Sequence, residues 1–139
     1  MIRSAFFAFG LLAAATPAFA IDFEENDQGQ IEFTMPSGNV GCAYTPEGGT
    51  GTYEPMDGGP ELSCDRVDPA YVRVMMGPAG KPKRYTNVGD ASCCGSMQIF
   101  EYGEVWKHDG FRCVSSETGL SCKRGSHGFS MSRRAVKTW

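Results

Sequence analysis

The chain has 139 residues, of which 21% are charged, and a formal net charge of −3 at pH 7. This length allows one modest hydrophobic core, and the acidic balance argues against nucleic acid as a partner. After residue 20 no apolar run approaches the roughly 20 residues that a membrane-spanning helix needs.

Residues 1–20 have the pattern of a secretory signal peptide. Arg3 lies in a short first region, an apolar run covers residues 5–15, and Ala-Phe-Ala at 18–20 forms an A-x-A cleavage site. The sequence therefore predicts cleavage before Ile21 and a periplasmic or secreted protein, with no transmembrane segment after cleavage. All six cysteines lie beyond this point, and an even count in an exported small protein is typical of a disulfide framework.

The rest of the chain predicts an acidic lead-in at residues 21–30, exposed to solvent, and a single β domain at 31–139. Short alternating runs separated by Gly- and Pro-rich turns favour an all-β fold, a small antiparallel sandwich or barrel stapled by disulfides. No amphipathic helix is evident, and the last seven residues could form one helical turn. The predicted strands are 31–35, 40–44, 61–65, 71–76, 97–102, 104–106, 110–115, 120–124 and 128–132.

Turn chemistry predicts one disulfide, and an assumed strand pairing predicts a second. With Ser-Glu-Thr-Gly at 116–119 as the hairpin loop, Cys113 faces Cys122 at the roughly 4.5–5.5 Å Cα separation that a disulfide allows. If 40–44 pairs with 62–66, Cys42 likewise faces Cys64. The adjacent Cys93 and Cys94 leave three alternatives open: a bond to each other, a third structural bridge made by one of them, or a buried thiol.

Loop 45–60 is dominated by Gly, Pro and Thr and is either flexible or a binding loop with Tyr53 at its tip. The only histidines are His108, next to Asp109, and His127, next to Ser126. Neither a nucleophile elbow nor a metal-binding spacing accompanies them, so the sequence predicts no catalytic residue, no metal and no cofactor. His127 is expected at a tight turn with a bond to the backbone.

Aromatic and basic side chains supply the candidate binding residues. An aromatic groove could be lined by Tyr102, Trp106 and Phe111 with Arg112, although such aromatics also build small β cores. Cations gather toward the end of the chain without an acidic residue after Glu117, which suits an anionic envelope component or an acidic protein. The candidate binding residues are Tyr102, Trp106, Arg112, His127, Arg133 and Arg134.

Five motifs in order carry a resemblance to an uncharacterised family of small secreted bacterial proteins, a domain of unknown function. They are S-G-N-V-x-C at 37–42, Y-G-x-x-W at 102–106, G-F-x-C at 110–113, G-x-x-C at 119–122 and S-H-G-F at 126–129 followed by Ser132-Arg133. The family more often has glycine where Ser126 stands. The resemblance implies a compact exported β domain and adds no catalytic residue.

The sequence thus favours an exported, non-enzymatic β domain that binds a partner through loops and its basic end. Two alternatives stay open. One is an inhibitor of a secreted hydrolase, such as a lysozyme, that presents loop 45–60, and the other is a redox protein that uses Cys93 and Cys94.

Overall fold

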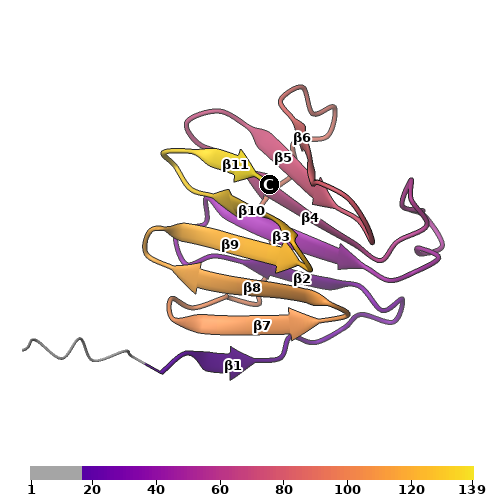
Figure 1. Ribbon diagram of the computed structural model, residues 1–139, viewed down its shortest axis with the longest axis horizontal. Coiled ribbons are helices and arrows are strands. Elements are labelled where there is room, and N and C mark those ends of the chain that lie inside the picture. The colour runs from indigo at the N-terminus through magenta and orange to yellow at the C-terminus, as the bar shows by residue number, and fades with distance from the viewer. Residues whose placement is uncertain (1–16) are drawn as a thin grey trace, which may run out of the picture.

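The computed structural model describes residues 17–139, which form two β-sheets packed face to face (Figure 1). Neighbouring strands are antiparallel except β1 and β7, which are parallel. Sheet A has the order β1 (Phe19–Ile21), β7 (Glu104–His108), β8 (Phe111–Ser116), β9 (Gly119–Arg124), β10 (His127–Met131) and β11 (Val136–Thr138). Sheet B has the order β2 (Ile31–Thr34), β3 (Val40–Thr45), β4 (Glu61–Arg66), β5 (Val72–Met76) and β6 (Lys83–Tyr85). The described residues contain no helix, which confirms the predicted all-β class.

The core lies between the two sheets and is filled by the inward-facing residues of both. Alternation along each strand places one side chain inward and the next outward. Aromatic rings from different segments meet there: the Phe33 ring centroid lies 5.2 Å from that of Trp106 and 5.2 Å from that of Phe100. Such tilted and edge-on pairs add to the stability that apolar burial provides.

Two disulfides join directly opposed strands inside this core. Cys42 on β3 pairs in register with Cys64 on β4, and Cys113 on β8 with Cys122 on β9, with Cα–Cα distances of 4.1 Å in both pairs. The β8–β9 register is the one that the turn chemistry predicts, and the β3–β4 register is the one that the assumed pairing of 40–44 with 62–66 requires. The third disulfide joins Cys93 to Cys94.

Three segments differ from the sequence-based expectation. Residues 97–102 are not a central strand: this segment crosses from sheet B to sheet A, since Thr34 bonds Gln98 and Phe100 while Ser115 bonds Phe100 and Gly103. The end of the chain forms β11 instead of a helical turn, because the open edge of β10 offers hydrogen bonds that one isolated turn lacks. Strand β6, which pairs with β5, is absent from the predicted strands: its first two residues belong to the Gly- and Pro-rich basic segment at 77–84, which has the composition of a loop.

The start of the described chain also departs from the expectation of a solvated lead-in. Phe23 stacks on Phe33, with ring centroids 4.8 Å apart, and thereby anchors the acidic segment to the core. The signal-peptide prediction falls mostly on residues 1–16, which lie outside the described residues. Its predicted cleavage site after Ala20 lies within β1.

Candidate functional site

The structure separates the six candidate binding residues. Tyr102, Arg133 and Arg134 come together around one groove, whereas Arg112 lies on the outer face of sheet A and His127 begins β10. Trp106 and Phe111 are each 1% exposed, pack in the core and do not line the groove that contains Tyr102. A groove lined by all three aromatic residues is therefore wrong, and for Trp106 and Phe111 the alternative of a role in the core holds.

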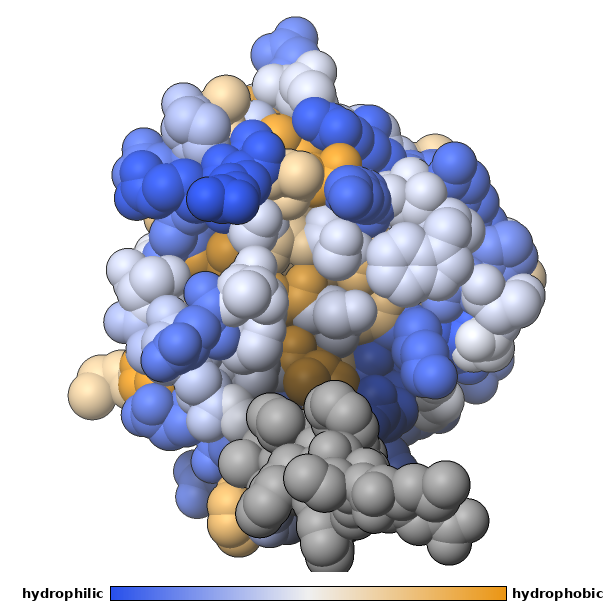
Figure 2. Space-filling model, turned by 60° about the vertical axis from the view of Figure 1, so that its left-hand side comes forward, coloured by the Kyte–Doolittle hydropathy of each residue, from blue (hydrophilic) through white to orange (hydrophobic). Residues whose placement is uncertain are grey.

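A groove of about 610 Å³ lies at the end of the sandwich where the β8–β9 and β10–β11 turns meet the turn before β3. Its apolar lining includes Met35, Val40 and Met131, and Tyr102, which is 42% exposed, lies beside them. Figure 2 views the molecule toward this end and shows a hydrophobic band between more hydrophilic rims. This volume is in the range of small-ligand pockets.

Several residues of the sequence motifs build the walls of this groove. The Asn39 side chain exchanges hydrogen bonds with the backbone of Asp68, donating to its carbonyl at 3.1 Å and accepting from its N–H at 2.7 Å. Gly119 has φ of 132°, and a Cβ there would lie 2.5 Å from the Met131 carbonyl oxygen, so only glycine fits. These motif positions shape the groove and are explained by backbone geometry.

Three cations form a row across the outer face of sheet A, which we call the basic row: Lys107, Arg112 and Lys123. Lys107 on β7 pairs directly with Arg112 on β8, which pairs directly with Lys123 on β9. Within residues 17–139 none of the three makes an ion pair. Glu104 is the only acidic residue in β7–β11, and its carboxylate accepts the Glu101 N–H.

An indole and one further cation lie on the same outer face as the basic row. Lys123 pairs with Gly128, and a Cβ on Gly128 would lie 2.7 Å from the ring of Trp139, so this ring lies over the glycine on the outer face. Trp139 is 44% exposed. Lys137 on β11 pairs with Ser130, which pairs with Ser121, two residues before Lys123. Arg134 lies at the other end of the strands, where it lines the groove and a neighbouring hollow that contains Lys137.

Both histidines contact residues that belong to the framework of the fold. The His108 ring stacks on Trp106 with centroids 5.7 Å apart, and Tyr44 donates a 2.8 Å hydrogen bond to Asp109. Burial, followed by that hydrogen bond, raises the pKa of Tyr44. His127 Nδ1 lies 3.3 Å from the Trp139 carbonyl oxygen, which is the type of backbone contact that the sequence predicts.

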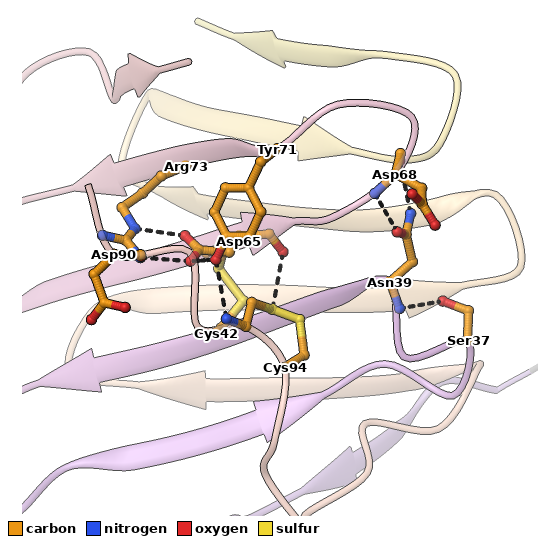
Figure 3. The surroundings of a disulfide bond; sticks show 11 residues. Ser37, Asn39, Cys42, Asp65, Asp68, Tyr71, Arg73, Asp90 and Cys94 are labelled. Carbon is orange, nitrogen blue, oxygen red and sulfur yellow. Dashed lines mark hydrogen bonds and ion pairs between the residues drawn. A yellow bond between two sulfur atoms is a disulfide. The ribbon is translucent and has the colours of Figure 1, made fainter. Parts of the chain in front are cut away.

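Loops cover much of the outer face of sheet B and border an open cavity of about 170 Å³. At its side, Arg73 donates two 2.7 Å hydrogen bonds to Asp65, which also accepts a 2.5 Å bond from the Tyr71 hydroxyl (Figure 3). Cys93 and Cys94 lie over Gly41 at the cavity, and the Cys93 N–H donates to Tyr71 at 3.1 Å. Sequence reasoning missed the three polar residues.

The sequence reasoning also missed Thr34. It is 5% exposed and lines the same cavity, and its hydroxyl has no hydrogen-bond partner among the described residues. A hydroxyl that is buried without a partner is uncommon in proteins.

Comparison of the chain with models of known protein families, with curated proteins and with solved structures finds no match. The resemblance to a domain of unknown function therefore stays a prediction. Over residues 17–139, no helix is long and apolar enough to span a membrane, and no three His, Cys, Asp or Glu side chains are grouped to hold a metal ion. The class that the fold defines is a disulfide-stapled all-β sandwich.

Proposed function

We propose that this protein is an exported, non-enzymatic β domain that docks on an anionic membrane surface through the outer face of sheet A. The basic row carries the proposal. Like charges directly opposite each other in a sheet destabilise it, since their Cβ atoms are only roughly 4.5–5.5 Å apart. A sheet face that keeps three such cations with no ion pair among the described residues is best explained by a negatively charged partner.

The chemistry of this face favours lipid head groups over a soluble acidic protein. The strands present a broad surface, and the exposed Trp139 beside Lys123 has the amphipathic character that places tryptophan at the level of head groups. Each Lys or Arg near an anionic bilayer contributes about 1 kcal/mol. The groove with Tyr102 and Arg134 lies at the other end of these strands, beside the β8–β9 and β10–β11 turns, and is not part of the docking face.

The inhibitor alternative gains no support from loop 45–60. Tyr53, the expected tip of that loop, donates a 2.6 Å hydrogen bond to Glu61 and is held against sheet B. Backbone hydrogen bonds also join Gly48 to Gly58 and Thr50 to Tyr53. An inhibitor of a secreted hydrolase stays a prediction without a contact in its favour.

Two double variants with equal changes in charge test the docking proposal. Lys107→Gln with Lys123→Gln removes two cations of the basic row, and Lys81→Gln with Lys83→Gln removes two cations beside sheet B. The probe is co-sedimentation with vesicles of phosphatidylcholine and phosphatidylglycerol, with pure phosphatidylcholine vesicles as the uncharged reference. We expect the first variant to bind roughly 30-fold more weakly than the wild type and the second to bind almost normally.

Added salt should weaken wild-type binding, because it screens exposed charges. Equal losses in the two double variants would show that total charge acts instead of the basic row. Equal binding to both kinds of vesicle would overturn the proposal.

A further inference from the structure

We propose that Cys93–Cys94 is a thiol–disulfide exchange site that takes electrons from a dithiol, while the other two disulfides stay intact. This inference is independent of the docking proposal. It starts from the contrast among the three bonds: Cys42, Cys64, Cys113 and Cys122 are at most 6% exposed, whereas Cys93 and Cys94 are half-buried. A thiolate must reach a sulfur atom in order to attack it, so access separates the pair from the framework.

The Cys93–Cys94 bond is expected to contribute little to the stability of the fold. It joins residues one apart in sequence, whereas the other two bonds join residues 22 and 9 apart on different strands. A disulfide stabilises a fold chiefly by closing a loop in the unfolded chain, and the effect grows with loop length. A bond between neighbours closes almost no loop, so the fold does not depend on it.

The surroundings of the pair have room for the exchange and an acceptor for its product. The cavity of about 170 Å³ lies against both cysteines and is large enough to admit a small thiol-bearing side chain. Cys93 Sγ is 3.7 Å from the backbone oxygen of Asp65, which can accept a weak hydrogen bond from the S–H that reduction creates.

The pair is held in place by the sheet beneath it. A Cβ on Gly41 would lie 2.9 Å from Cys94 Cβ and 3.1 Å from Cys93 Sγ, so glycine at this point of β3 provides the space for the disulfide. Tyr71, fixed by Asp65, bonds the Cys93 N–H (Figure 3). The anchoring bonds involve the backbone of Cys93 and do not need the disulfide.

The exchange balances with a dithiol as the co-reactant. One thiolate of the dithiol attacks a sulfur of the pair, forms a mixed disulfide and releases the other cysteine as a thiolate, which takes up a proton. The second thiol of the partner, once deprotonated, attacks the partner's first sulfur atom in the mixed disulfide. This step forms the disulfide of the partner and releases the second cysteine of this protein, which is also protonated. Two electrons and two protons reach the pair, and the partner leaves as a disulfide.

The first test treats the full folded chain with increasing dithiothreitol without denaturant, quenches with acid and alkylates with N-ethylmaleimide. Intact mass and peptide mapping then count and place the labels. We expect a species with two labels, both at Cys93 and Cys94, at dithiothreitol concentrations at least about tenfold below those that reduce the other bonds. Joint reduction of all three bonds, or no label before unfolding, would overturn the proposal.

The second test asks whether the bond is merely structural. We expect Cys93→Ser with Cys94→Ser to lower Tm by less than about 3 °C, and Cys113→Ser with Cys122→Ser to lower it by roughly 10 °C. If the first double variant loses as much as the second, the pair is a structural bridge and the exchange role fails. The labelling experiment decides the question on the wild-type chain if the second variant does not fold.

Discussion

The outer faces of the two sheets carry their charges in opposite ways. On sheet B, loops 45–60 and 86–98 cover the face, and Glu61 and Asp65 are buried with partners for their carboxylates. On sheet A the cations of the basic row lie side by side without an acidic partner. The charges of one face are paired within the chain, whereas those of the other have no ion-pair partner among residues 17–139, and this difference is the basis of the docking proposal.

The largest effect is expected from Asp65→Asn on sheet B. Asp65 is 7% exposed, and the substitution leaves the Arg73 guanidinium without its carboxylate, so we expect a loss of about 2 kcal/mol in unfolding free energy. Urea unfolding followed by the fluorescence of buried Trp106 measures it. Asp68→Asn, which touches only the exposed 3.6 Å pair with Arg133, is the control and should cost less than about 0.5 kcal/mol. Equal losses of unfolding free energy in the two variants would show that the Asp65–Arg73 pair contributes no more to stability than an exposed ion pair.

A smaller, pH-dependent effect is expected at Glu61. Burial raises the pKa of Glu61 in the folded protein above its ordinary value of 4.5, so the ionised form is disfavoured on folding. The stability that Glu61 contributes is complete below pH 4.5 and is lost as pH rises from there through the folded-state pKa. Glu61→Gln keeps an acceptor for the Tyr53 hydroxyl. The unfolding free energy of this variant should increase relative to that of the wild type as pH rises to 7.

Thermal or urea unfolding at several pH values measures this difference. A gap between Glu61→Gln and the wild type that does not change between pH 4 and 7 would show that this carboxyl does not titrate differently in the folded state.

The smallest effect, with the opposite sign, is expected at Arg112. Replacing Arg112 with Gln relieves repulsion from Lys107 and Lys123, so we expect the unfolding free energy to rise by up to about 0.5 kcal/mol. Lys81→Gln, at an exposed loop position outside the basic row, is the matched control and should leave stability unchanged. A clear loss of stability for Arg112→Gln in urea unfolding would mean that contacts within the chain stabilise the basic row. The two outer faces would then not differ in the way described above.

Local signals predicted the β8–β9 hairpin that carries one core disulfide. The pairing of β3 with β4, which are separated by loop 45–60, was an assumption that the structure confirms. In the β8–β9 hairpin, alternation fixes which side chains share a face, and the Ser-Glu-Thr-Gly loop fixes the register, so Cys113 meets Cys122. The basic character of the chain after Glu117 was also evident. That the row includes Lys107 depends on the β7–β8 pairing, which composition does not reveal.

The missed features depend on contacts between segments distant in sequence. The position of Cys93 and Cys94 over Gly41 is set by an irregular loop, which has no periodicity to read. Tyr102 and Trp106 differ in burial because Gly103, with φ of 91°, bends the chain between them, so that one ring stays outside and the other enters the core. A short motif containing both aromatics does not show where the bend directs each ring.

The pairing of β1 with the edge of β7 has a consequence for aggregation. Cleavage after Ala20 would remove two of the three β1 residues and leave backbone N–H and C=O groups of β7 open at the edge of sheet A. Open strand edges invite pairing with a second molecule, and lysine on such an edge opposes it. Lys107 projects from β7, so two copies that paired edge to edge would bring equal charges together. The same lysine would therefore keep the exported protein from extending its sheet from one molecule to the next.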